Sequence, residues 1–262
     1  MARYLKLFWV QLRSSILLAL QYRWDFLTDG AISLLYAGMA VAPLLVVFHT
    51  REQIAGWTAP EALLVSGWFI FLDAVIDGAI SPSLTSVVDH IRKGTLDFVL
   101  LKPADAQFLV STARFQIWKL TNVFASLAVF AYAFRQMGRT PHPSGVLTAL
   151  GLVAVSTILL YSLWILTVSA AFYVVKVDNL SYLFTSVFDA ARWPASVFRG
   201  AVRIIFTFVI PLALMTTYPA EALLGRLEPG KVFFSVLGTL AFAAFARLMW
   251  LQSIGKYTSA SS

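Results

Sequence analysis

The sequence predicts an all-α integral membrane protein with six transmembrane helices. Of its 262 residues, 59% are hydrophobic and only 13% are charged, whereas soluble domains carry about 25% charged residues. Six apolar runs approach or exceed the roughly 20 residues that cross a bilayer as a helix. They do not alternate and are longer than the 9–11 residues of a typical barrel strand, so helices are expected. The runs lie at 26–48, 61–80, 117–134, 145–173, 201–218 and 231–252.

Residues 1–25 precede the first run and are too polar to span a membrane. Their apolar side chains recur at steps of three and four, which indicates an amphipathic helix lying in the membrane interface. These side chains are Leu5, Phe8, Trp9, Leu12, Ile16 and Leu20. The helix is either a mechanical element or an anchor for the first span. We therefore divide the chain into this helix and a six-span domain, 26–262. A second segment of similar pattern, 176–200, is either interfacial or cytosolic.

The basic residues predict the orientation. With the N-terminus inside, 15 of the 20 Lys and Arg residues fall in segments on the cytoplasmic side. Loops rich in Lys and Arg stay in the cytoplasm, so both termini are expected there, in a multi-pass protein of the bacterial inner membrane. The net charge of +7 is spread over several loops. This spread indicates contact with anionic lipid and not with nucleic acid.

The stretch 81–116 interrupts the apolar pattern between the second and third spans. It carries several basic residues, with a Gly stop at Gly94 and a Pro stop at Pro103. Gly ends helices in the left-handed conformation, and Pro cannot continue them. The stretch is therefore predicted to be a cytosolic helical elbow, folded for contact with a soluble partner.

The residues exclude several chemistries. There is no Cys, and the three His residues fall in three different loops, so thiol chemistry is excluded and a His-built metal site is not expected. Gly225–Lys231 fits the start of a phosphate-binding loop, but Val232 stands where such a loop has the Ser or Thr that binds Mg²⁺. We interpret it as a turn before the last span. The chain is therefore expected to be no enzyme and to bind no cofactor itself.

Two carboxylates lie inside the second run. Asp73 and Asp77 are four residues apart, so they share one helix face. An intramembrane carboxylate is by default a functional hypothesis, here a translocation path for protons or for a cationic substrate. The alternative is a structural ion pair or hydrogen bond to another span or subunit.

Two motifs resemble the permease subunits of type-2 ABC exporters. Residues 94–103, G-T-L-D-F-V-L-L-K-P, are similar to the family pattern G-x-[LI]-D-x-x-L-L-[KR]-P. Later, Pro211-Leu212-Ala213 and the stretch from Tyr218 to Leu224 resemble the pattern P-L-A … Y-P-A-x-x-L-L between spans five and six. With six spans, an interfacial helix and an elbow, the resemblance covers essentially the whole chain.

The resemblance implies a half-transporter that exports an unidentified substrate. Two permease subunits, identical or homologous, would pair with a dimer of cytosolic ATPase subunits that use ATP and Mg²⁺. Residues 84–93 would be the helix that docks on the ATPase, and the docking residues would be Leu84, Val88, Asp89, Arg92, Lys93 and, just after the helix, Gly94. The elbow would be fixed by Leu96, Asp97, Lys102 and Pro103. A short external helix would include Pro219, Glu221, Leu224 and Arg226.

Two other classes of function stay open at this point. An ion-coupled secondary transporter would use Asp73 and Asp77 as its coupling site. A non-transport membrane protein, such as an assembly factor, is the third class. The substrate is not indicated by any residue pattern.

Overall fold

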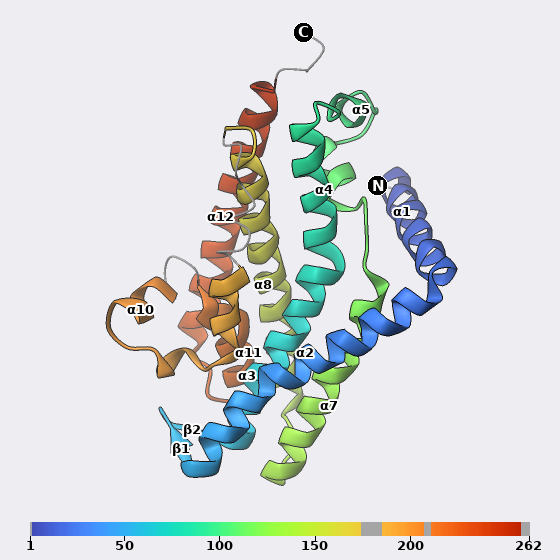
Figure 1. Ribbon diagram of the computed structural model, residues 1–262. Coiled ribbons are helices and arrows are strands. Elements are labelled where there is room, and N and C mark those ends of the chain that lie inside the picture. The colour runs from blue at the N-terminus through green and yellow to red at the C-terminus, as the bar shows by residue number, and fades with distance from the viewer. Residues whose placement is uncertain (1, 174–184, 207–210, 258–262) are drawn as a thin grey trace.

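A computed structural model describes residues 2–173, 185–206 and 211–257 of the chain. Almost all of its regular structure is helical, and long helices run roughly side by side (Figure 1). The longer elements are α1 (Ala2–Gln21), α2 (Arg23–Thr50), α3 (Ala59–Val75), α4 (Ser81–Arg92), α7 (Leu120–Met137), α8 (Pro143–Ala170) and α12 (Pro229–Gly255). Short elements between them are the hairpin β1 (Gln53–Ile54) and β2 (Trp57–Thr58), α5 (Asp97–Leu100), α6 (Ala106–Ser111), α10 (Gly200–Ile204) and α11 (Tyr218–Leu223). Single turns of 3-10 helix lie at Ile117–Lys119, Asp189–Arg192 and Ala195–Val197.

Among the described residues, five helices are long and apolar enough to cross a membrane. They are Arg23–Thr50, Ala59–Arg92, Ile117–Met137, Pro143–Ala170 and Pro229–Gly255, which match five of the six predicted spans. The predicted span at 201–218 is only partly visible, because residues 207–210 lie outside the described part. Its described remainder is α10 and a π-helical turn, Ala213–Thr217. The sixth span therefore stays a prediction.

The helix that contains the second span does not end at residue 80, where the predicted apolar run ends. Helix α3, a π-helical turn at Ile76–Ile80 and α4 form one helix of 34 residues, Ala59–Arg92. At 1.5 Å per residue it is about 51 Å long, against a hydrocarbon core of about 30 Å. About two fifths of this helix therefore extends beyond the core.

Pro82 lies inside this continuous helix. A Pro inside a helix leaves the carbonyl four residues earlier without a donor, here that of Gly78. In the structure the Gly78 carbonyl accepts a hydrogen bond from the backbone N–H of Gln116, at 2.8 Å. The π-helical turn supplies a further adjustment, since the Ser81 N–H bonds to the Ile76 carbonyl. A segment far along the chain thus completes the helix.

Helix packing explains two glycines in the spans. Helix α3 packs on α7, and a Cβ added at Gly67 would lie 2.5 Å from Cε1 of Phe130. Helix α8 packs on α11 and α12, and a Cβ at Gly145 would lie 2.6 Å from the carbonyl oxygen of Ala222. Small residues allow such close approach between membrane helices.

A helix precedes the first span, but it is shorter than the predicted 1–25, because α1 covers Ala2–Gln21 and α2 begins at Arg23. A single non-helical residue, Tyr22, divides α1 from α2, which run in different directions (Figure 1). Leu5, Trp9 and Leu20 on α1 are exposed, whereas Leu12 and Ile16 are half-buried and the Phe8 ring meets Phe115 edge to face. Only part of the predicted apolar face is thus free to contact lipid, and the interfacial location of α1 stays a prediction.

A buried glutamate joins three loops at the end of the molecule that carries the hairpin. Glu61 forms a capping box with Thr58 at the start of α3. Its Oε1 accepts a hydrogen bond from Arg226 and lies 3.6 Å from Nη2 of Arg139. These arginines come from the connections before α12 and before α8. Their pairing with one carboxylate holds the loops together.

Candidate functional site

The long helix Ala59–Arg92 ends in a protruding turn that we call the tip, residues 93–104. Gly94 has a φ of 64°, the left-handed conformation that Gly adopts without strain. The N–H of Thr95 then bonds to the His90 carbonyl at 2.9 Å. The predicted stop at Gly94 is therefore confirmed. The following apolar segment forms only one helical turn, α5.

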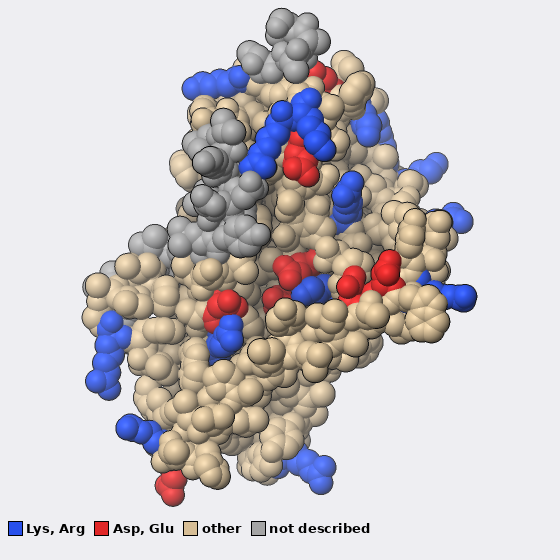
Figure 2. All heavy atoms as spheres, viewed as in Figure 1, with Lys and Arg blue, Asp and Glu red and all other residues tan. Residues whose placement is uncertain are grey.

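Two large apolar side chains at the tip are exposed to solvent. Phe98 is 71% exposed and Leu101 is 81% exposed. Lys93 and Lys102 beside them are exposed as well. Figure 2 shows basic side chains gathered over this end of the molecule. An exposed aromatic and an aliphatic residue within a polar rim are the usual composition of a protein-binding surface.

The predicted docking residues divide into two groups. Leu84 and Val88 are buried in the hydrophobic core, so they pack inside the fold and do not reach a partner. Asp89, Arg92 and Lys93 lie on the exposed face. Surface contact at 84–93 is thus restricted to the polar side of α4.

The predicted elbow residues also divide by burial. Leu96 is fully buried and fixes α5 against the core, while Asp97 is half-buried. Lys102 and Pro103 are exposed at the end of the tip. Leu96 is therefore the apolar anchor of the tip, and Lys102 belongs to its outer surface.

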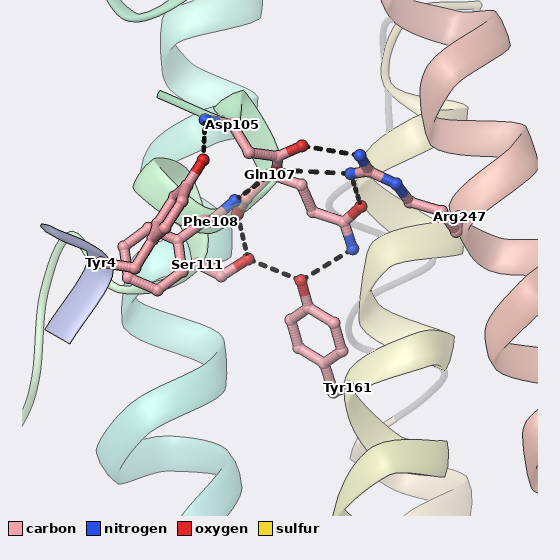
Figure 3. Close-up of polar contacts among 7 residues, drawn as sticks. All are labelled: Tyr4, Asp105, Gln107, Phe108, Ser111, Tyr161 and Arg247. Atoms are coloured by element: carbon pink, nitrogen blue, oxygen red, sulfur yellow. Dashed lines mark hydrogen bonds and ion pairs between the residues drawn. The ribbon is translucent and has the colours of Figure 1, made fainter. Parts of the chain in front are cut away.

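Helix α6, which follows the tip, is a junction between distant helices. Asp105 begins it as an N-cap, because its carboxylate accepts from the Phe108 N–H at 3.0 Å. The same carboxylate forms a two-pronged ion pair with Arg247 of α12, at 2.6 Å and 3.4 Å. Nη1 of Arg247 also donates to Oε1 of Gln107 at 2.5 Å. Figure 3 shows this network between α6 and α12.

Helix α8 joins the same junction through Tyr161. Its hydroxyl accepts from Nε2 of Gln107 at 2.9 Å and lies 2.7 Å from Oγ of Ser111 (Figure 3). The three helices α6, α8 and α12 are thus linked by side chains that are half-buried. A displacement of the tip would be transmitted to α8 and α12 through these bonds.

Helix α1 lies along the same stretch of chain. Its Tyr4 hydroxyl accepts from the Asp105 N–H at 3.2 Å, and Oγ of Ser15 accepts from the Phe115 N–H at 3.1 Å. The Tyr4 and Phe108 rings meet edge to face, with centroids 4.9 Å apart. Helix α1 is therefore attached to the segment that returns from the tip to the third span.

The return segment is also fastened to the long helix. The Oγ of buried Ser83 donates to the Arg114 carbonyl at 2.7 Å and accepts from the Arg114 N–H at 2.9 Å. Together with the bond from Gln116 to Gly78, this holds residues 114–116 beside the π-helical turn. The tip is thus the end of a braced structure, and not a free loop.

Burial and charge affect the protonation of Asp105. The hydrogen bond from Arg247 lowers the pKa of this carboxyl below its usual range, and partial burial opposes that effect. Asp105 therefore remains ionised well into the acid range, and the ion pair with Arg247 persists there.

The intramembrane carboxylates share a counter-cation. Nζ of Lys119 lies 2.8 Å from Oδ2 of Asp77 and 3.4 Å from Oδ2 of Asp73. Asn122 donates to the same Asp73 oxygen at 3.2 Å and accepts from Ser33 of α2. Figure 2 shows acidic side chains beside a basic one in the middle of this face. These bonds join α2, α3 and α7, so they favour the structural alternative for the two aspartates.

The residues assigned to an external helix lie around α11. Pro219 is buried, and Leu224 follows the helix as its C-cap. Glu221 bonds to Nζ of Lys231 at 3.2 Å, while Arg226 bonds to Glu61. Gly225 has a φ of 69°, so the segment resembling a phosphate loop contains a turn, and its lysine is engaged with Glu221.

The sequence interpretation missed Asp105, Gln107, Tyr161 and Arg247. One signal was present. Arg247 is the only basic residue within the last apolar run, 231–252, other than Lys231 at its start. A charge in such a run requires a partner. That partner, Asp105, lies 142 residues away, beyond any periodic pattern.

The fold defines a multi-pass helical membrane protein with an exposed tip at one end. Comparison with known protein families makes this specific: residues 34–261 match the family described as ABC-2 family transporter protein. The chain therefore belongs to the ABC-2 transporter family, as the resemblance implied. No curated protein and no solved structure matches it.

Proposed function

We propose that this chain is the membrane permease subunit of an exporter whose ATP is hydrolysed by a separate cytosolic ATPase. The proposal rests on the exposed tip, residues 93–104, of a chain that belongs to the ABC-2 family. The tip presents Phe98 and Leu101 to solvent beyond the end of a helix too long for the bilayer core. Exposed apolar side chains in that position are typical of a surface that a partner protein covers.

The tip and α6 together form the proposed route of transmission. ATP and Mg²⁺ bound between two ATPase subunits would close them and move the tip. Asp105 and Gln107 would then carry the movement to Arg247 and Tyr161, and so to α12 and α8. The segment that transmits the movement must be rigid, and the hydrogen bonds between Ser83 and Arg114 fasten it to the long helix.

The assembly is proposed as two permeases and two ATPases, with the tip in the cytoplasm. The concentration of basic side chains at the tip end supports that orientation (Figure 2). Two copies of this chain, or this chain and a homologue, would complete the transport path. The substrate would move outward.

The experiment uses the permease and its ATPase reconstituted together in liposomes. The tested variant is Phe98→Ser with Leu101→Ser, and a second is Arg92→Glu with Lys93→Glu. Both should reach the membrane in normal amounts and lose substrate-stimulated ATPase activity and export together. The control is Arg51→Glu, an exposed cation in the loop beside the hairpin. Unchanged export in both tip variants would overturn the proposed docking surface.

A further inference from the structure

A cavity of about 530 Å³ lies between α8, the π-helical turn at Ala213–Thr217, α11 and α12. Its size is within the range of about 300–1,000 Å³ typical of ligand sites. Leu159, Phe234 and Phe242 contribute apolar walls, and Glu228 and Lys231 lie at one end. The cavity is remote from the tip, because Lys231 is near the start of α12 and Arg247 near its end.

A polar side chain inside the cavity lacks a partner. Thr239 lines the cavity and is only 3% exposed. Its hydroxyl finds no hydrogen-bond partner among the described residues, although other hydroxyls in these spans bond back to a carbonyl, as Ser253 does. A buried hydroxyl without a partner is costly. A bound molecule with an acceptor at this depth would remove that cost.

The charged end of the cavity carries one acidic and one basic side chain. Lys231 uses one of its three donors on Glu221, and the start of the 27-residue helix α12 favours an anion nearby. Within the described chain the Glu228 carboxylate forms no capping hydrogen bond with α12. A phosphate beside Lys231 and an ammonium beside Glu228 would match this pair.

The spacing of these groups fits a lipid. Thr239 lies eight residues beyond Lys231, about 12 Å along the helix, with apolar walls on either side. A hydroxyl at that depth can donate to an ester carbonyl below a phosphate head group. The walls at Leu159 and Phe242 then contact hydrocarbon.

We propose that this cavity binds a phospholipid with a zwitterionic head group that contains a phosphate and a primary ammonium. The head group lies at Lys231 and Glu228, an ester carbonyl accepts from Thr239, and one acyl chain occupies the apolar cavity. The site is independent of the proposed ATPase contact, so either can fail without the other. A second copy of this chain is the competing occupant.

The test uses a glycine that faces the cavity. Gly238 lines it, and a Cβ added there meets no described atom within 4 Å. Gly238→Phe therefore fills the cavity without forcing the helices apart. The matched control is Gly151→Phe, because Gly151 is on an exposed face of α8 outside the cavity lining and also has no described atom within 4 Å.

The full chain is purified in nanodiscs that contain phosphatidylethanolamine with a photoreactive group in one acyl chain. After irradiation, mass spectrometry should find lipid adducts on the cavity walls of α8 and α12. Gly238→Phe should lower this labelling about tenfold, the loss expected when two methylenes lose their contacts. Thr239→Val should lower it several-fold, and Gly151→Phe should leave it unchanged.

Three outcomes would overturn the proposal. The first is equal labelling in the unaltered chain and Gly238→Phe. The second is equal labelling when the same probe carries a phosphoglycerol head group without an ammonium. The third is a chain-to-chain cross-link from a photoreactive residue placed at Phe234, with no lipid adduct, which would identify a second copy as the occupant.

Discussion

The ion pair between Asp105 and Arg247 offers a quantitative test of the junction at α6. Arg247→Met keeps the apolar stem but removes the charge, the ion pair and the 2.5 Å bond to Gln107. Asp105→Asn removes the charge but keeps a good N-cap for α6. The two changes therefore separate the ion pair from the cap.

The magnitudes follow from geometry and exposure. Asp105 and Arg247 are 37% and 41% exposed, so solvent screens the pair and it contributes about 1 kcal/mol. Asp105→Asn should therefore lower the free energy of unfolding by about 1 kcal/mol. Arg247→Met should lower it by about 2 kcal/mol, because it also removes the charged hydrogen bond to Gln107.

The assay is equilibrium unfolding of both single variants and the double variant in detergent micelles. The double variant should lose about 1 kcal/mol less than the sum of the single losses. Lys93→Met, an exposed cation at the same end, should change the stability by less than about 0.5 kcal/mol. Losses that simply add would refute the coupling of α12 to α6.

The pKa of Asp105 gives this test a pH dependence. Because Arg247 lowers the pKa in the folded state, the stabilisation is complete above the unfolded pKa of about 3.9. It is lost as the pH falls through the lower folded value. The difference between the unaltered chain and Asp105→Asn should thus be constant from pH 7 to about pH 5 and shrink below pH 4. A difference that disappears between pH 7 and pH 5 would contradict the structure.

Three further substitutions test the packing. Lys119→Met should destabilise the chain by about 3 kcal/mol by leaving two carboxylates without their cation; adding Asp77→Asn should restore part of it, and failure to do so would disprove the shared pairing. Gly67→Leu should cost about 1–3 kcal/mol through the clash with Phe130, whereas Gly151→Leu should be tolerated. Glu61→Gln should cost about 2 kcal/mol, with exposed Glu52→Gln as its control. Thermal unfolding of purified protein measures all three.

Local sequence signals predicted much of the helical architecture. Hydropathy located five spans that the structure contains, and three- and four-residue spacing located α1. The glycine signal located the helix end at Gly94, because the left-handed conformation there is a local property. These features depend on residues that are close together in the chain.

The remaining features depend on contacts between distant residues. The apolar run was predicted to end at residue 80, but the N–H of Gln116 bonds to the Gly78 carbonyl and the helix continues past Pro82 to Arg92. Leu84 and Val88 were assigned to a docking surface because the family resemblance implies one at 84–93, yet they are buried. Whether these two side chains are buried depends on which segments pack against α4, and no local sequence pattern specifies that.

The junction at α6 was missed for the same reason. Arg247 and Asp105 come from opposite halves of the chain, so the charge of Arg247 within an apolar run indicates a partner without specifying which residue it is. Tyr161 lies within the apolar run 145–173, where no local pattern distinguishes it. Only the fold brings the three together.

The contact between the tip and an ATPase is the central claim, and site-specific cross-linking tests it most directly. A photoreactive amino acid replaces Leu101, the most exposed apolar residue of the tip, with the same replacement at Leu147 on α8 as a control. In native membranes, Leu101 should cross-link to a soluble subunit that hydrolyses ATP, and addition of a non-hydrolysable nucleotide should change the yield. Cross-links from Leu101 to lipid alone, as at Leu147, would contradict the account.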